Sequence, residues 1–172
     1  MGAFSKVKAA LGLEKYKSKE PSSRPEQTPV GPKLDNPVEL GHVHFLRNLK
    51  AGYEEARTTG KPIFLLFQEI PGCSTCTSFG REILQNEAMV QAISNAFVPV
   101  AINNRCLVGS DARTCSKFKE PKLNNPVVRL IDAKGKDLVP RREGIYSSSQ
   151  LLPRMEKALK KSNRQDLLHH LP

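Results

Sequence analysis

The sequence contains no tryptophan, only four cysteines and no long apolar segment. A chain of 172 residues can bury an adequate core without disulfides, so four cysteines do not indicate a secreted, disulfide-linked scaffold. The longest apolar run, residues 62–67, is far too short to span a bilayer. No signal sequence is evident. We therefore expect an intracellular, cytoplasmic protein with one main domain and no transmembrane segment.

The chain is strongly basic, with 27 lysines and arginines against 17 acidic residues and a formal net charge of +10. Such a charge attracts polyanions whatever the fold. The basic residues are nevertheless spread along the whole chain and interleaved with acids, and no recognised nucleic-acid motif accompanies them. We therefore expect no nucleic-acid partner and interpret the charge as a solvated surface that favours acidic substrates or partners.

Residues 1–38 differ in composition from the rest. Prolines alternate there with serine, glutamine, glutamate and lysine, a composition that cannot bury enough apolar surface to fold. A short basic helix near the start could contact a membrane surface, but its apolar stripe is so short that a frayed terminus is the simpler interpretation. We interpret residues 1–38 as a flexible, basic, proline-rich tail and residues 39–172 as the folded domain.

Helical and extended patterns alternate along the predicted domain. Apolar residues at helical spacing predict helices over residues 46–59, from the first cysteine pair to 85, after Asn86 and from about Ser149. Apolar or β-branched runs predict strands at residues 42–45, 62–69, 97–102, 127–131 and 138–142, the last two as a hairpin. The cysteine-bearing segment after residue 102 is expected to be irregular.

The most informative motif is Cys73-Ser74-Thr75-Cys76, which follows a predicted buried strand and opens a predicted helix. The first turn of a helix brings two such sulfurs to one side, where they can form a disulfide. Unpaired N–H groups and the helix dipole favour a thiolate at the first position. We therefore predict Cys73 as the nucleophile and Cys76, more buried, as the resolving thiol.

Two simpler interpretations of this spacing are weaker. Zinc would require a second ligand pair, but Cys106 and Cys115 are separated by eight residues and the histidines lie near the ends. An inert buried pair is disfavoured because Pro71-Gly72 and the polar residues between the cysteines indicate a surface turn. We expect neither a metal nor a cofactor.

The run at residues 60–67 followed by Cys-x-x-Cys looks like thioredoxin-like proteins. Residues 67–73, together with 124–129, resemble the VPGUxxT thioredoxin-like subfamily, some members of which carry selenocysteine. The similarity covers roughly residues 39–165, with Cys73 at the selenocysteine position and Cys76 replacing a threonine. It implies an α/β thioredoxin-like fold, with a central mixed sheet flanked by helices.

The resemblance also implies a substrate-binding surface. Pro126 falls where thioredoxins place a cis-proline facing the active cysteine, which leaves the backbone of Asn125 free to pair with an extended substrate. From the residues alone, an ordinary trans proline opening a strand is the alternative. We assign Gly72, Ser74 and Thr75 to substrate binding as well.

Two family features are missing. Phe67 stands where thioredoxins bury an aspartate that relays a proton to the resolving cysteine, and Gly72 replaces the usual tryptophan. If Glu69 does not reach Cys76, deprotonation of that thiol must depend on water. The spacing of Cys106 and Cys115 leaves two alternatives open, a second disulfide across the turn-forming residues 109–111 or two free thiols.

These observations predict a monomeric thiol–disulfide oxidoreductase. Its partners would be a protein or small-molecule disulfide, or a peroxide, and a thiol reductant. The alternative is a non-catalytic peptide-binding or metal-binding module, in which the cysteines have no redox role.

Overall fold

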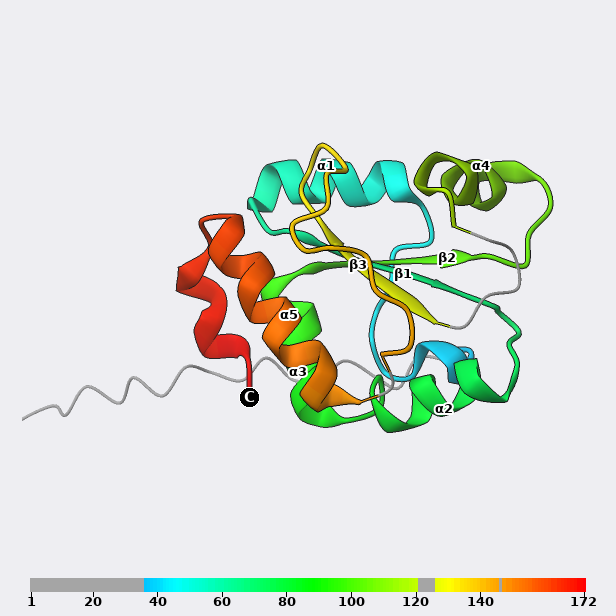
Figure 1. Ribbon diagram of the computed structural model, residues 1–172, viewed down its shortest axis with the longest axis horizontal. Helices are drawn as coiled ribbons and strands as arrows, with labels where there is room; N and C mark the ends of the chain where they lie inside the picture. The colour runs from blue at the N-terminus through cyan, green and yellow to red at the C-terminus, as the bar shows by residue number, and fades with distance from the viewer. Residues whose placement is uncertain (1–35, 121–125, 146) are drawn as a thin grey trace, which may run out of the picture. The chain divides into compact units, whose positions relative to one another are not determined.

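A computed structural model describes residues 36–120, 126–145 and 147–172 of the chain (Figure 1). The predicted tail, residues 1–38, therefore lies almost wholly outside the described residues, as does Asn125. The helices are α1 (Leu49–Thr59), α2 (Ser74–Glu82), α3 (Glu87–Ala96), α4 (Gly109–Phe118) and α5 (Ser148–Lys161), with short 3₁₀ segments η1 (Val38–Leu40) and η2 (Gln165–His170). Among the described residues, no helix is long and apolar enough to cross a membrane.

A mixed sheet forms the centre of the domain, as predicted, and it has three strands among the described residues. Strand β1 (Ile63–Gln68) lies between β2 (Val98–Asn103), which is parallel to it, and β3 (Val127–Ile131), which is antiparallel. The end of β1 is paired on both sides, since Gln68 is opposite Asn103 and Phe67 is opposite Val127. The segment after β1, which holds the cysteine pair, therefore leaves the sheet at the end where β1 and β2 finish and β3 begins.

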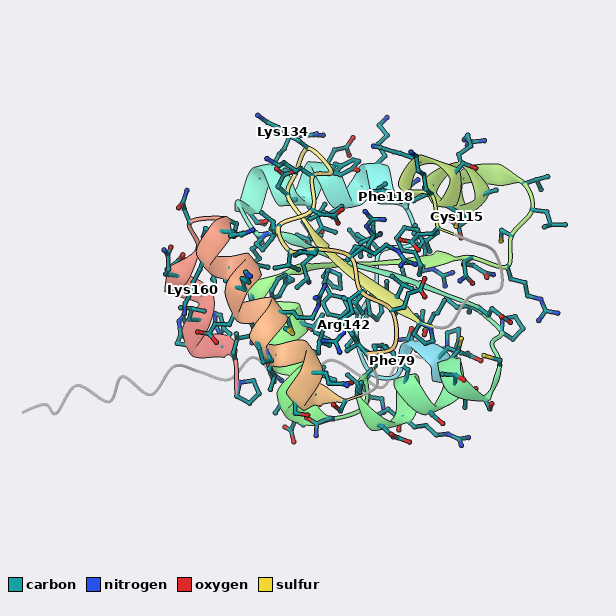
Figure 2. The ribbon with its side chains drawn as sticks, in the orientation of Figure 1. Phe79, Cys115, Phe118, Lys134, Arg142 and Lys160 are labelled. Atoms are coloured by element: carbon teal, nitrogen blue, oxygen red, sulfur yellow. The ribbon has the colours of Figure 1, made fainter. Side chains whose placement is uncertain are left out.

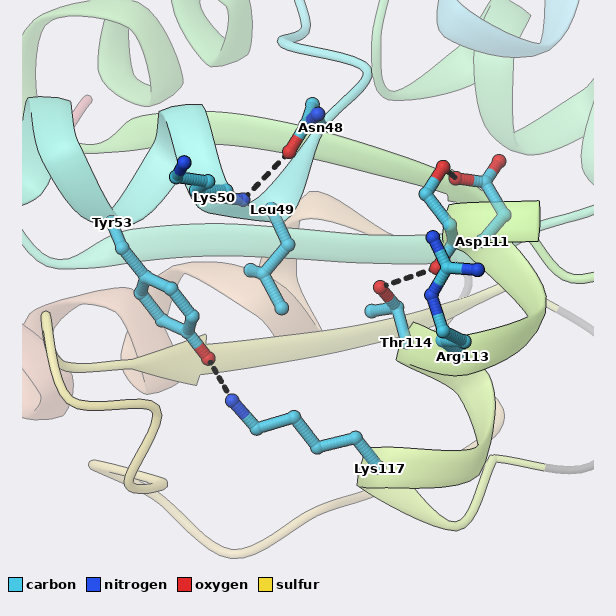
Figure 3. Close-up of a pocket in the computed structure, with 9 residues that line it drawn as sticks. Asn48, Leu49, Lys50, Tyr53, Asp111, Arg113, Thr114 and Lys117 are labelled. Carbon is cyan, nitrogen blue, oxygen red and sulfur yellow. Dashed lines mark hydrogen bonds between the residues drawn. The ribbon is translucent and has the colours of Figure 1, made fainter.

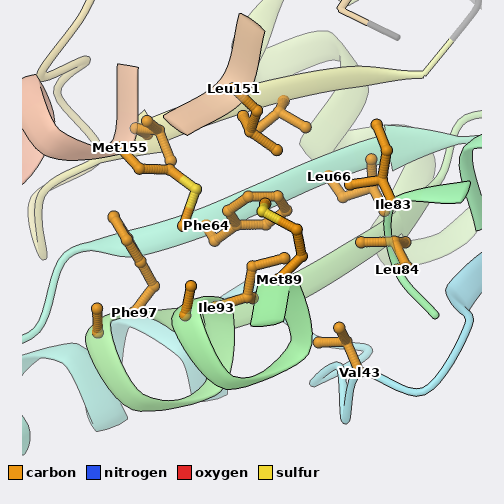
Figure 4. Close-up of a cluster of buried hydrophobic side chains, with 14 of the residues drawn as sticks. Val43, Phe64, Leu66, Ile83, Leu84, Met89, Ile93, Phe97, Leu151 and Met155 are labelled. Atoms are coloured by element: carbon orange, nitrogen blue, oxygen red, sulfur yellow. The ribbon is translucent and has the colours of Figure 1, made fainter. Parts of the chain in front are cut away.

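Side chains of β1 alternate between two cores, as the period of a strand requires. Phe64 and Leu66 pack with the helices on one face, including Met89 of α3 and Met155 of α5 (Figure 4). Leu65 and Phe67 point to the other face and belong to a second cluster with residues of α1 and α4. All six residues of β1 are buried, so the strand is a rigid support for the loop that follows it.

Two predicted strands are wrong. Residues 42–45 form no strand, and pairing there is limited to a parallel bridge between Leu46 and Val100. Residues 138–142 form no strand either, although Asp137 bridges Ile131 and the N–H of Leu138 donates to Leu130 at 2.8 Å. Pro140 has no N–H to continue that ladder, which explains why the hairpin ends at once.

Four of the five α-helices of the described residues lie where they were predicted, although not always with the predicted extent, and α4 was not predicted. The segment expected to be irregular contains α4, and residues 109–111 open this helix instead of forming a turn. Helix α1 begins at Leu49, three residues later than predicted, because the Asn48 side chain caps it by accepting from the N–H of Lys50 at 2.8 Å. Pro153 lies inside α5, beyond its first turn.

Candidate active site

Cys73 is the N-cap residue of α2, directly after the loop that leaves β1. Its extended backbone (φ −71°, ψ 175°) keeps the side chain outside the helix, and the residue is exposed. The Cys73 Sγ lies 3.5 Å from the Cys76 Sγ, within hydrogen-bond distance and longer than the roughly 2.05 Å of a disulfide. The pair is therefore a dithiol in which one sulfur faces solvent.

The backbone of α2 favours the thiolate of Cys73. The N–H of Cys76 above all lowers the pKa of Cys73, and the Cys76 thiol and the N–H of Thr75 act in the same direction. Partial burial and the nearby charge of Glu69 oppose this shift without reversing it. A thiol that is both exposed and easily ionised is the chemical requirement for a nucleophile.

Cys76 has the opposite environment. It is fully buried, and this burial is the main reason that its pKa rises to about 11. The N–H of Glu69 points at the sulfur and partly offsets the effect of burial. At neutral pH Cys76 is a protonated thiol, so it needs a proton acceptor before it can attack.

A buried carboxylate, Glu39, lies beside the dithiol. The N–H of Gly72 donates to Glu39 Oε1 at 2.8 Å, and only 5% of this residue is exposed. Gly72 has no side chain, and the point where its Cβ would lie is 2.6 Å from the Cβ of Cys76 and 3.1 Å from the Cγ of Glu39. The side chains of Glu39 and Cys76 therefore lie side by side over Gly72.

Two further contacts hold Glu39 in place. The Nε2 of the buried Gln68 donates to the carbonyl oxygen of Glu39. Segment η1 packs directly on α2 at Gly80, where any Cβ would overlap the carbonyl oxygen of Val38. Gln68 Oε1 is buried and has no hydrogen-bond partner among the described residues. A polar group of this kind is uncommon in a core, so Glu39 and Gln68 together form a buried polar cluster beneath the cysteine loop.

Phe67 occupies the position of the family aspartate, and the buried acid that accepts the N–H of Gly72 comes from another element, η1. Phe67 points into the second core and packs edge-on against Phe118, so it cannot serve the cysteines. Glu69 is half-buried, and its contributions to the pair are a backbone N–H near Cys76 and a charge near Cys73. Analysis of the sequence missed Glu39 because no local spacing links η1 to the cysteine motif; only tertiary packing does.

The loop before the cysteines is bonded to the end of β2. Asn103 Nδ2 donates to the carbonyl of Ile70 at 2.6 Å, and the N–H of Ile70 donates to Asn103 Oδ1 at 3.2 Å. The N–H of Asn103 in turn donates to Asp111 of α4 at 3.0 Å. This chain of bonds connects the cysteine loop with the β2–α4 segment.

The other predicted site residues are placed as follows. Pro126 is buried and precedes Val127, which pairs with Phe67, so it lies at the same edge of the sheet as the cysteine loop. Ser74 is exposed in the first turn of α2 and Thr75 follows it, half-buried. Because Asn125 lies outside the described residues, the substrate-binding assignment and the cis bond at Pro126 stay predictions.

The choice between a disulfide and two free thiols at Cys106 and Cys115 also stays a prediction. Cys115 is buried in α4, and this burial is the main reason that its pKa rises to about 11, while Cys106 is half-buried in the loop before the helix. Both are free thiols in the structure. Cys115 belongs to the second core cluster, with Phe67 and Phe118, and among the described residues no hydrogen bond joins it to Cys73 or Cys76.

Comparison with known proteins agrees with this architecture. Residues 44–133, more than half of the chain, match a family model described as thioredoxin-like. A solved structure titled DsbH Oxidoreductase superposes with a TM-score of 0.55 at 19% identity, over 73% of this chain and 90% of that one. No curated protein matches the sequence. The likeness to the solved structure shows the fold alone, whereas the family match covers the cysteine motif, and the chain belongs to the thioredoxin-like family.

Proposed function

We propose that this protein is a thiol–disulfide oxidoreductase whose nucleophile is Cys73 and whose resolving thiol is Cys76. The observation that supports this most strongly is the asymmetry of the pair. One sulfur is exposed at a helix N-terminus with a lowered pKa, and the other is buried 3.5 Å away with a raised pKa. This is the arrangement that an attack followed by an intramolecular release requires.

The reaction takes place in two exchanges. The thiolate of Cys73 attacks one sulfur of a substrate disulfide, which forms a mixed disulfide and releases the other substrate sulfur as a thiolate. Cys76 then loses its proton and attacks the Cys73 sulfur, which releases the second substrate thiol and leaves a Cys73–Cys76 disulfide. The substrate gains two electrons and the dithiol loses them, so an external thiol must reduce the enzyme again.

Glu39 is the group that we assign to deprotonate Cys76. Its Cγ and the Cβ of Cys76 both lie close to the Cβ position of Gly72, and its carboxylate accepts the N–H of Gly72 away from bulk solvent. In the second exchange the proton passes from the Cys76 thiol to this carboxylate and then to the departing substrate thiolate. The proton balance therefore closes within the site.

The substrate-binding part of the proposal comes from the resemblance to the VPGUxxT subfamily. The backbone around Asn125-Pro126 would hold an extended substrate chain beside Cys73. A peroxide is an alternative oxidant for the same pair, in which Cys73 becomes a sulfenic acid and Cys76 condenses on it with loss of water.

The test uses the uncharged substrate bis(2-hydroxyethyl) disulfide with the full chain. We expect Cys76→Ser to accumulate a Cys73 mixed disulfide that intact mass spectrometry detects, and Cys73→Ser to form none. The wild-type chain should instead end as an internal disulfide two hydrogens lighter. If no mixed disulfide forms in Cys76→Ser while the protein is folded, the oxidoreductase assignment is wrong and a non-catalytic binding module becomes the better account.

A further inference from the structure

The segment between β2 and α4 exposes two apolar side chains, Leu107 and Val108. It follows the end of β2, at the same end of the sheet as the cysteine loop. Leu107 is 70% exposed and Val108 is 82% exposed, and they are the two large apolar side chains that stand out in this way among the described residues. They border a hollow of about 410 Å³ on the outer side of α4. Water-exposed apolar side chains that line a concave surface are typical of contact sites.

The surface around this pair is positively charged. The exposed side chains of the segment include Arg105, Arg113 and Lys117. The acid nearby, Asp111, already accepts hydrogen bonds, from the N–H of Asn103 at 3.0 Å and from Ser110. An acidic partner would therefore meet basic groups with little opposing charge.

A second hollow, on the other side of Arg113, extends the basic surface toward α1 (Figure 3). It has a volume of about 360 Å³, and its charged lining consists of Lys50, Arg113 and Lys117 with one acid, Asp111. Lys117 Nζ donates to the Tyr53 hydroxyl at 3.1 Å and lies over the Tyr53 ring, which orients its charge. The first turn of α1 contains no acid to balance the helix dipole, so negative charge is favoured here.

This surface lies at the same end of the sheet as the reactive cysteine, Cys73. Asn103 ends β2 opposite the end of β1, and its side chain holds Ile70, three residues before Cys73. The N–H of Cys106 donates to the carbonyl of Asn103, which turns the chain and keeps Leu107 near this edge. Figure 1 shows the β2–α4 connection and the start of α2 at the same end of the sheet.

We propose that Leu107 and Val108, with Arg105, Arg113 and Lys117, form a docking surface for substrate proteins. This surface fits an extended segment of the substrate protein. The segment carries an apolar side chain flanked by carboxylates and lies next to the disulfide that Cys73 attacks. The apolar side chain covers Leu107 and Val108, and the carboxylates pair with the basic groups of α4. This inference rests on the proposed redox function and names the class of substrate for that site.

The test compares synthetic disulfide peptides of equal length with an uncharged small disulfide. One peptide carries leucine flanked by glutamates next to its cysteine, the second has lysines in place of the glutamates, and the third has serine in place of the leucine. We expect kcat/KM for the first peptide to exceed that for the second and third by about tenfold, the size of effect that one good apolar contact or charge pair provides.

Variants of the docking surface test whether the preference for the first peptide comes from this surface. Leu107→Ser with Val108→Ser should lower kcat/KM for the first peptide about tenfold, mainly through KM, and Arg113→Glu should reverse the preference between glutamate and lysine peptides. Both changes affect exposed side chains, so folding should be retained. Lys157→Glu is the matched charge control, because Lys157 is exposed on α5, the helix that carries Lys160 in Figure 2, and α5 packs on the face of the sheet opposite α4.

The small substrate, bis(2-hydroxyethyl) disulfide, separates the two proposals. All these variants should reduce it at the wild-type rate, because it is too small to reach the docking surface. The docking proposal is overturned if the serine variant reduces all three peptides as the wild type does, or if it loses the small substrate equally. If the wild type itself fails to reduce the small disulfide, the oxidoreductase function fails, and the docking surface for its substrates fails with it.

Discussion

Replacing Glu39 with glutamine removes a proton acceptor from the buried side of the dithiol and changes little else. Glutamine has the same length, and its amide oxygen can still accept the hydrogen bond from the N–H of Gly72. With a pKa of about 11, Cys76 is a thiolate in about one molecule in ten thousand at pH 7. A positioned base commonly accelerates such a step by about 10²–10⁴-fold. We therefore expect Glu39→Gln to slow resolution about a hundredfold at pH 7.

The assay mixes the reduced protein with Ellman's reagent, a coloured aromatic disulfide, and follows two phases of thiol release. The first phase reports the attack by Cys73 and should change little, whereas the second reports the attack by Cys76 and should slow. The difference should disappear as the pH approaches 11, because Cys76 then ionises without help. Glu69→Gln is the matched control for the second phase, because it removes an acid from the same loop without touching the buried cluster; its first phase can change, since the charge of Glu69 raises the pKa of Cys73.

A second phase with the wild-type rate and pH profile in Glu39→Gln would show that Glu39 does not act as the base. Loss of both phases together would indicate a distorted loop instead of a missing base, and circular dichroism would check the fold. Glu39→Asp provides a further readout, because it keeps an acid one methylene shorter. It should recover part of the second phase if proton transfer is the role of Glu39.

Three other predictions follow from the same structure. Iodoacetamide should alkylate Cys73 with a pH midpoint below the ordinary thiol value, because its pKa is lowered, whereas Cys76 should react only near pH 11; equal midpoints in peptide mass mapping would contradict this. Gly80→Ala should destabilise the fold by about 1–3 kcal/mol in urea unfolding although alanine favours helices, because its Cβ meets η1; a more stable protein would disprove this contact. Glu120→Gln should cost about 3 kcal/mol and lower the Tm by about 10 °C, because this buried carboxylate pairs with Arg129 and Arg141; an unchanged Tm would show that the pairs contribute little.

Local patterns predicted the parts of the fold that local physics determines. The buried strand β1, the parallel β2 and the cysteine-led helix α2 all lie where apolar runs and helical spacing placed them. The strand predicted at 138–142 failed because one backbone bridge is too little to extend past Pro140. Helix α4 was missed because its buried face is small, with Thr114, Cys115 and Phe118 as its buried residues, and gives a weak periodic signal.

At the candidate site, too, local spacing predicted the cysteine pair but not the residues that tertiary packing brings to it. The sequence predicted that Cys73 would be the exposed, easily ionised thiol and Cys76 the buried one, because both properties follow from their positions in one helical turn. The acid beside them could not be predicted in this way. Glu39 lies on a separate 3₁₀ segment, and its place depends on contacts with Gly72, Gln68 and Gly80 that no spacing encodes.

Gly72 and Gly80 therefore have a shared function in this structure. A side chain at Gly72 would meet the carbonyl oxygen of Glu69 at 2.5 Å and the Cβ of Cys76 at 2.6 Å, and it would also press on the Cγ of Glu39 at 3.1 Å. Gly80 lets η1 lie flat on α2, which brings Glu39 to that position. On the proposed role of Glu39, a thioredoxin-like chain with phenylalanine in place of the buried aspartate supplies an acid from a neighbouring segment, because one residue of the loop before α2 and one residue of α2 have no side chain. If Glu39 has the proposed role, the glycine before the cysteine motif, where the family usually has tryptophan, is a requirement of the replacement and not merely a loss.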